Sequence, residues 1–265
     1  MLCPWLCQAL ASGALARFEP PVGCYLGAFI EHDSRARGDL AAFERIVGRR
    51  HACYINYAGY GRPFPSLWVE KVGAHGAAAH IAFEPNGGLD KIRDDDYLRG
   101  WAQAAAASGV PIFLRFASEM NGNWMAYSGN PSLYIEKWRI LAKVMHEEAP
   151  NVALVWCPFS SPRQNINAYY PGDDYVDWVG VNIYSVVYHN GDRNEPADSE
   201  DPREELLKSV YETFSQRRPI MICEYAATSF CRVVGKATTA FAVRKMTDLY
   251  GDLPKRFPRV KCVQW

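Results

Sequence analysis

The segment that decides the fold is residues 110–158, which read VPIFLRFASEMNGNWMAYSGNPSLYIEKWRILAKVMHEEAPNVALVWCP. It opens with an apolar run typical of a buried strand, at residues 110–117, and closes with a second such run at residues 152–158. Between them, Asn130 and Pro131 predict the N-cap and first residue of a helix. Apolar residues then recur at helical spacing, at Tyr134, Trp138, Leu141 and Met145. The segment therefore predicts a strand–helix–strand unit.

The same alternation runs along the rest of the chain. Strands are predicted at residues 24–30, 51–60, 77–83, 110–117, 152–158, 176–184, 219–225 and 260–265. Helical patterns lie between them, at residues 38–48, 66–72, 94–108, 130–147, 201–214 and 238–250. Eight strands alternating with helices predict an α/β fold, a single-domain (β/α)8 TIM barrel over residues 21–265. A doubly wound open sheet is the alternative, but no strand is followed by a glycine-rich phosphate-binding motif.

The two ends of the chain are less regular. Residues 1–20 predict a separate N-terminal segment, either a packed helix or the remnant of a signal peptide, although the first basic residue is Arg17. No helix follows the last predicted strand, so the barrel is expected to lack its last helix or to have the gap covered by residues 4–16. Cys3 and Cys7 lie one helical turn apart and have no assigned function. A secreted or extracellular location is expected, with a cytoplasmic one left open.

Composition excludes several classes of function. The 265 residues carry 29 Lys+Arg and 29 Asp+Glu, so there is no basic excess to bind nucleic acid or an anionic membrane. No apolar run approaches the length of a membrane span. The eight cysteines form no CxxC motif and HExxH is absent, so no catalytic metal is expected. Cys223 precedes Glu224, and strand alternation predicts that its thiol faces the helices. We expect a monomer.

Polar residues at the ends of the predicted strands are the candidates for chemistry, because barrel enzymes take their reactive groups from these ends. Glu119 and Glu224 follow the fourth and seventh strands and predict a pair of carboxylates across the barrel mouth. Arg115, four residues before Glu119, is expected on the same strand face as its ion-pair partner. Paired carboxylates in a cleft rimmed by tryptophan are what glycosidic bond cleavage requires. The alternative is a structural Glu119–Arg115 ion pair with the tryptophans in the core.

Several motifs resemble one known family. Residues 114–124 read LRFASEMNGNW, and they follow FEP at residues 83–85. Further support comes from WCP at residues 156–158, WVGVNIY at residues 178–184 and PIMICEY at residues 219–225. In this order, the motifs resemble glycoside hydrolase family 26, the β-mannanase family of clan A. The likeness extends over about residues 25–265.

The resemblance implies a set of roles and implies neither a metal nor an organic cofactor. Glu119 would be the general acid/base and Glu224 the nucleophile of a retaining double displacement, with the carboxyl groups about 5–5.5 Å apart. Tyr184 would donate a hydrogen bond to the nucleophile, and Arg115 would keep it ionised. Trp265 would form an apolar floor beneath the sugar at the cleavage point. The residues expected to bind a polysaccharide substrate are Arg115, Ser118, Trp124, Trp156, Asn182, Tyr184, Trp265 and Glu84.

Two residues depart from the pattern of the mannan-degrading members. Ser118 stands where they usually carry histidine, and Asn182 where they usually carry aspartate. Both are expected to face the sugar, so these departures concern the choice of substrate, whereas both glutamates of the catalytic pair are kept. An endo-β-1,4-mannanase is the first hypothesis, with an endo-β-glucanase (lichenase) or a β-1,3-xylanase as alternatives. A hypothesis of another class is a barrel that binds polysaccharide, or associates with an exopolysaccharide, without hydrolysing it.

Overall fold

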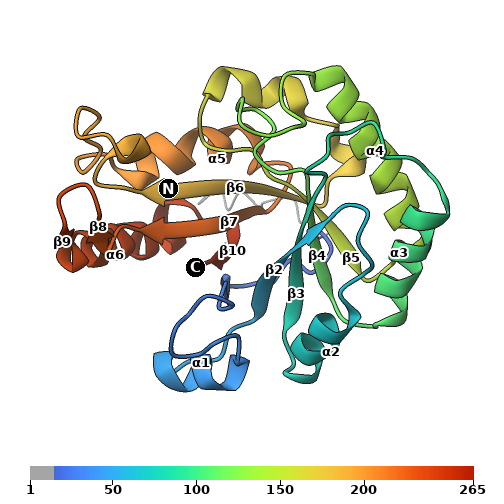
Figure 1. Ribbon diagram of the computed structural model, residues 1–265, viewed down its shortest axis with the longest axis horizontal. Coiled ribbons are helices and arrows are strands. Elements are labelled where there is room, and N and C mark those ends of the chain that lie inside the picture. The colour runs from blue at the N-terminus through green and yellow to red at the C-terminus, as the bar shows by residue number, and fades with distance from the viewer. Residues whose placement is uncertain (1–14) are drawn as a thin grey trace, which may run out of the picture.

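The computed structural model describes residues 15–265, and eight parallel strands close into a barrel (Figure 1). The strands follow one another around the barrel in chain order, and the last pairs with the first. They are β1 (Tyr25–Ala28), β2 (Cys53–Gly59), β3 (Ala78–Glu84), β4 (Ile112–Phe116), β5 (Val152–Trp156), β6 (Trp178–Ser185), β7 (Ile220–Ala227) and β10 (Val260–Gln264). The predicted (β/α)8 barrel is therefore confirmed.

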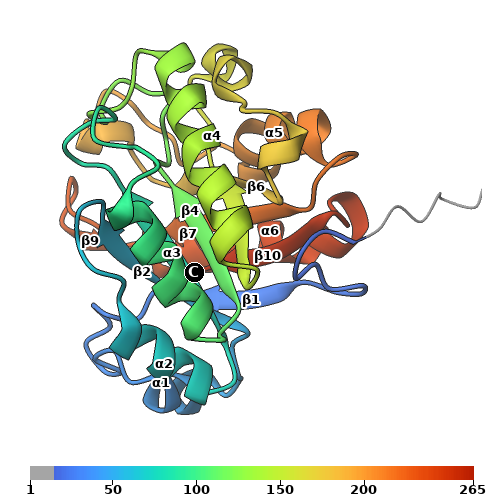
Figure 2. The same cartoon turned by 90° about the vertical axis from the view of Figure 1, so that its right-hand side faces the viewer.

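Helices cover the outside of the barrel, and Figure 2 shows α3 and α4 side by side over β4. The α-helices are α1 (Leu40–Val47), α2 (Ser66–Ala74), α3 (Asp96–Ala107), α4 (Pro131–Glu148), α5 (Lys208–Phe214) and α6 (Thr239–Arg256). The predicted N-cap of α4 is present: the Asn130 side chain accepts a hydrogen bond from the backbone N–H of Leu133 at 3.0 Å. No helix among residues 15–265 is long and apolar enough to cross a membrane.

Short elements fill the loops. The predicted helix after Asp201 divides into a π-helical turn, η4 (Pro202–Leu207), and α5. Three 3₁₀ turns, η1 (Arg163–Tyr169), η2 (Asp173–Tyr175) and η3 (His189–Gly191), lie on either side of β6. A two-stranded antiparallel sheet of β8 (Phe230–Cys231) and β9 (Lys236–Ala237) follows β7. No sequence pattern predicted this small sheet, because two-residue strands are too short to show a hydrophobic period.

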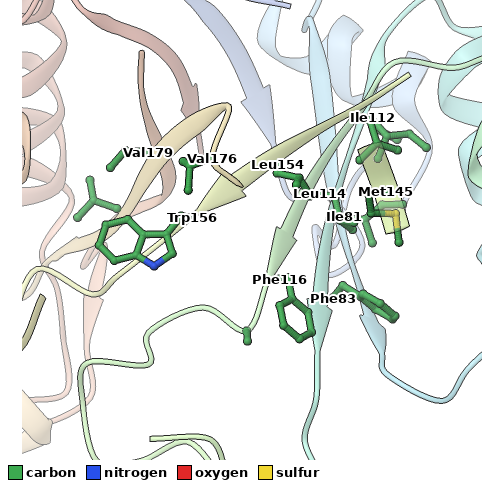
Figure 3. Close-up of a cluster of buried hydrophobic side chains, with 14 of the residues drawn as sticks. Ile81, Phe83, Ile112, Leu114, Phe116, Met145, Leu154, Trp156, Val176 and Val179 are labelled. Carbon is green, nitrogen blue, oxygen red and sulfur yellow. The ribbon is translucent and has the colours of Figure 1, made fainter. Parts of the chain in front are cut away.

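The apolar core has two layers, one on each side of the barrel wall. The outer layer lies between strands and helices, and Figure 3 shows Phe83, Phe116 and Met145 among its members. The inner layer fills the barrel and includes Phe113 and Trp178, whose rings meet edge to face. Side chains of a strand alternate between the layers, which is why the strands read as continuous apolar runs.

Residues 15–19 lie against the barrel at the amino ends of its strands. Trp178 Nε1 donates a hydrogen bond to the carbonyl of Arg17 at 2.7 Å, and Arg17 Nη1 donates to the carbonyl of Val152. The Phe18 ring packs edge-on against Phe113. This part of the predicted N-terminal segment is thus joined to the barrel. The predictions for residues 1–14, including Cys3 and Cys7, lie outside the described residues.

The strand β7 contains an irregularity that overturns one prediction. Val181 of β6 pairs with Ile222, but the next residue, Asn182, pairs with Glu224, so Cys223 is an extra residue in the ladder. Cys223 belongs to the inner core layer, and its sulfur would lie 2.4 Å from a Cβ placed on Gly180. The prediction that this thiol faces the helices was wrong, because the bulge breaks the alternation from which it was derived.

Candidate active site

A cavity of about 670 Å³ opens at the carboxyl ends of the barrel strands. Its walls come from the ends of β2, β3, β4, β6 and β7 and from the loops that follow them. Glu119 and Glu224 both line it, and so do Arg115, Ser118 and Asn182. The two candidate catalytic carboxylates therefore share one pocket.

Glu224 is held by three donors. Arg115 Nη2 donates to its Oε1 at 2.5 Å, the Tyr57 hydroxyl donates to the same oxygen at 2.8 Å, and the Tyr184 hydroxyl donates to Oε2. Burial by itself would raise the pKa of Glu224, but the charge of Arg115 and the three hydrogen bonds outweigh it and lower the pKa. The expected pairing of Arg115 with Glu119 was wrong, since the guanidinium contacts Glu224. A carboxylate held ionised in this way is suited to nucleophilic attack.

Glu119 owes its position to the backbone after β4. The strand ends at Phe116, and both Ala117 and Glu119 have left-handed backbone conformations, with φ of 46° and 61°. Such conformations are unfavourable for residues other than glycine. They turn the chain so that the Glu119 N–H reaches the carbonyl of Cys157 at 2.9 Å and the carboxylate enters the cavity. Strand alternation does not extend past Phe116, which is why it misassigned the partner of Arg115.

Two donors contact the Glu119 carboxylate. Trp124 Nε1 donates to Oε2 at 2.9 Å, and Asn182 Nδ2 donates to Oε1 at 2.7 Å. Glu119 is therefore held by neutral donors, whereas Glu224 is held by a cation. A group with neutral partners can release and regain a proton without leaving a buried cation unpaired.

A third carboxylate, Glu84, lies in the same cavity at the end of β3. Ser118 Oγ donates to its Oε1 at 2.8 Å, and the Tyr127 hydroxyl donates to Oε2 at 2.5 Å. Burial raises the pKa of Glu84, and the opposing effects of Arg115, Tyr127 and Ser118 only partly offset it. Ser118 thus contacts Glu84 rather than presenting its hydroxyl freely to a ligand.

The tryptophans predicted to bind sugar differ in environment. Trp124 is 50% exposed at the cavity rim, with its ring edge-on to Phe159. Trp156 was wrongly predicted: it is fully buried in the outer core layer, against Tyr170 and Phe214 (Figure 3). Its neighbours along β5 face the barrel interior, so alternation points Trp156 at the helices. Trp265 is 38% exposed beside Tyr225 and is not among the residues that line the cavity.

Several lining residues were not predicted. Tyr57 lies two residues before the end of β2, within the carboxyl-terminal part of the strand from which barrel sites take their residues. Asn86, Phe159 and Asn190 lie in loops and carried no pattern of their own. Tyr127 is buried beneath Glu84.

Asn121 was quoted only within the family motif, and it has a structural role. Its side chain accepts from the N–H of Phe159 at 2.9 Å and donates to the carbonyls of Phe159 and Pro162. These bonds join the loop after β4 to the loop after β5. Within residues 15–265 there is no group of three or more His, Cys, Asp or Glu side chains arranged to hold a metal ion.

Part of the chain is similar in sequence to known glycoside hydrolases. Residues 82–196 match the family model described as glycosyl hydrolase family 26. A β-1,3-xylanase from a Vibrio species is 35% identical over 95 residues, which are 33% of this chain and 20% of the relative. A β-1,3-xylanase from an Alcaligenes species is 33% identical over 132 residues, 46% of this chain and 27% of the relative. The chain thus spans about a fifth to a quarter of the length of these relatives.

The barrel is also similar to solved structures. An endo-β-1,4-mannanase double mutant from Cellulomonas fimi superimposes with a TM-score of 0.67 at 16% identity. The match covers 92% of this chain and 65% of the other, and at this identity it speaks for the fold alone. The resemblance of the motifs to glycoside hydrolase family 26 is therefore confirmed, and the match to the family model extends over residues 82–196 of this chain.

Proposed function

We propose that this protein is a retaining endo-β-glycanase that uses Glu224 as the nucleophile and Glu119 as the general acid/base. The observation that carries the proposal is that two carboxylates line one cavity with opposite kinds of partners. Glu224 is bound by a buried guanidinium and two tyrosine hydroxyls, and Glu119 by an indole and an amide. Such a difference separates the role of an ionised nucleophile from that of a proton donor.

In the first step, Glu224 forms a bond to the anomeric carbon while the glycosidic bond breaks. Glu119 gives its proton to the departing oxygen, so the leaving sugar departs as a neutral alcohol. In the second step, Glu119 takes a proton from water as the water oxygen attacks the same carbon and releases Glu224. Net retention of configuration follows from two displacements on opposite faces.

The proposed substrate is a β-linked polysaccharide, with β-mannan first and β-1,3-xylan second. Exposed Trp124, adjacent to the acid/base, offers a flat face against a sugar ring next to the scissile bond. Mannan is supported by the motif resemblance. β-1,3-Xylan is supported by the two relatives named as β-1,3-xylanases. Secretion and a monomeric state stay predictions.

The test compares wild type with Glu224→Ala and Glu119→Ala on mannan, β-1,3-xylan and lichenan. We expect new reducing ends from at least one glycan with wild type, and a loss of about 10⁴-fold or more in Glu224→Ala, by analogy with removal of an essential nucleophile. Glu119→Ala should keep more activity on an aryl glycoside whose leaving group needs no proton. When hydrolysis of that substrate is monitored by NMR, the first sugar product observed should be the β-anomer.

Two results would contradict the proposal. Wild type that binds a glycan without producing reducing ends would instead support a non-hydrolytic polysaccharide-binding barrel. Initial release of the α-anomer would indicate an inverting mechanism. Circular dichroism of both variants must match that of wild type, so that lost activity is not lost folding.

A further inference from the structure

Asn182 lies at the centre of the hydrogen bonds around the two carboxylates. It is 1% exposed and pairs in register with Glu224 across the β6–β7 ladder. Its Oδ1 accepts from Arg115 Nη1 at 3.0 Å and from the Cys157 thiol at 3.3 Å. Its Nδ2 donates to Glu119 Oε1 at 2.7 Å. Both ends of the amide are thus engaged by protein groups.

The orientation of this amide follows from the chemistry of its neighbours. A guanidinium can only donate hydrogen bonds, so the amide oxygen must face Arg115. A carboxylate oxygen accepts, so the amide nitrogen must face Glu119. The reversed amide would set donor against donor at Arg115 and acceptor against acceptor at Glu119, and both clashes would be buried.

We propose that Asn182 is a positioning residue that fixes the acid/base relative to the nucleophile, an inference that rests on the proposed function of Glu119 and Glu224. It completes a chain of three bonds, of 2.5, 3.0 and 2.7 Å, that runs from Glu224 through Arg115 and Asn182 to Glu119. The expectation from sequence was that Asn182 binds the sugar. Its burial and its bonds to protein argue against that role.

The chain of bonds also explains why an amide suits this position. An aspartate here would have no hydrogen to donate to Glu119. Its negative charge would also face Arg115 and compete with Glu224 for the guanidinium. Asn182 therefore leaves the full charge of Arg115 available to Glu224 while it still holds Glu119.

Other titratable groups surround this chain of bonds and set its electrostatic background. They come from each element that packs against it: Tyr57 on β2, His80 and Glu84 on β3, Cys157 after β5, Tyr184 on β6 and Cys223 on β7. Among these groups, only Glu84 is a carboxylic acid like Glu224. Its effect on the pKa of Glu224 is the same in every variant. A change caused by a substitution at Asn182 is thus separable from this background.

The decisive variant is Asn182→Asp, which changes one donor into an acceptor at nearly constant volume. We expect kcat to fall by about 100-fold and KM to change by less than about threefold, because positioning is lost while sugar contacts are kept. The acidic limb of the kcat/KM profile should move up by about one pH unit, since Glu224 then shares Arg115 with a second carboxylate. Asn182→Ala should lower kcat without that shift.

A second measurement does not depend on activity. The carboxyl carbon of Glu224 is followed by NMR as the pH is varied, in wild type and in Asn182→Asp, and the titration midpoint should rise in the variant. Asn86→Asp is the matched control: it adds the same charge to the cavity wall, and within residues 15–265 the Asn86 side chain makes no hydrogen bond to either catalytic carboxylate. We expect the titration midpoint of Glu224 to rise more in Asn182→Asp than in Asn86→Asp.

The outcomes separate this inference from the proposed function. If wild type hydrolyses no glycan, the proposed function fails and the NMR titration still tests the chain of bonds. If wild type hydrolyses glycan but Asn182→Asp raises KM and leaves both kcat and the acidic limb in place, Asn182 binds sugar and the inference is overturned. An unmoved Glu224 titration would overturn it as well.

Discussion

Glu224 and Glu84 lie in one cavity, yet their pKa values are displaced in opposite directions. Glu224 has the Arg115 guanidinium in direct contact, and its pKa is lowered despite burial. Glu84 has only the neutral hydroxyls of Ser118 and Tyr127 in contact, and burial prevails to raise its pKa. The comparison teaches that burial does not by itself set the charge of a cleft carboxylate. That charge depends on whether the Arg115 guanidinium contacts the carboxylate directly.

Arg115→Met should produce the largest effect, because it removes the cation on which the comparison depends. Removing one partner of a buried ion pair costs about 3–5 kcal/mol. Both the free energy of unfolding and the rate of glycan hydrolysis should therefore fall steeply. Removal of the opposing charge raises the pKa of Glu224, and the acidic limb of the pH–rate profile should move to higher pH. Denaturant unfolding and kcat/KM against pH measure the two effects.

Arg139→Met is the matched control for the loss of an arginine. Arg139 lies on α4 and donates to the carbonyl of Pro171 at 3.0 Å, away from the cavity. It should keep the wild-type pH profile. If Arg115→Met also kept it, Glu224 would not depend on the guanidinium and the comparison would fail.

The pH dependence of stability should differ in sign between the two carboxylates. Glu224 has a lowered pKa, so its contribution is present above the ordinary value of about 4.5 and is lost as the pH falls through the folded value. Glu84 has a raised pKa, so its contribution to the stability of the folded state is present at low pH and is lost as the pH rises above 4.5.

Thermal unfolding of Glu224→Gln and Glu84→Gln between pH 4 and 7 tests this difference. Relative to wild type, Glu224→Gln should become less stable as the pH rises, and Glu84→Gln should become more stable. The expected differences are on the order of 1 kcal/mol, because each substitution keeps the size of the side chain. If stability relative to wild type changed with pH in the same direction in both variants, the two carboxylates would share one electrostatic environment.

The smallest expected effect comes from removing single hydroxyls. Tyr57→Phe removes the 2.8 Å bond to Glu224, and Tyr127→Phe removes the 2.5 Å bond to Glu84. Tyr57→Phe should lower kcat/KM by about tenfold and move the acidic limb slightly upward, since a donor to the ionised form is lost. Tyr127→Phe should leave that limb in place and raise the pKa of Glu84 further. If the acidic limb moved in Tyr127→Phe and stayed in place in Tyr57→Phe, the limb would report on Glu84 and not on Glu224.

Particular residues show how far sequence reasoning reaches. All eight barrel strands were predicted with ends that differ from the structure by at most two residues, because buried parallel strands read as apolar runs between turn signals. The same patterns placed Glu84, Glu119 and Glu224 at or just beyond the carboxyl ends of strands, and all three line the cavity. The prediction failed for Trp156, an aromatic residue at the end of β5 whose side chain lies on the outer face of the strand.

The sequence by itself determined the barrel and the three carboxylates at its mouth, since both follow from local hydrophobic period and from strand order. Only the tertiary structure decided which groups meet. The bulge at Cys223 and the left-handed residues Ala117 and Glu119 interrupt the two-residue period of β7 and β4 where the site begins. Contacts between residues 109 and 63 positions apart, such as Arg115 with Glu224 and Asn182 with Glu119, then depend on how strands far apart in sequence close into a barrel.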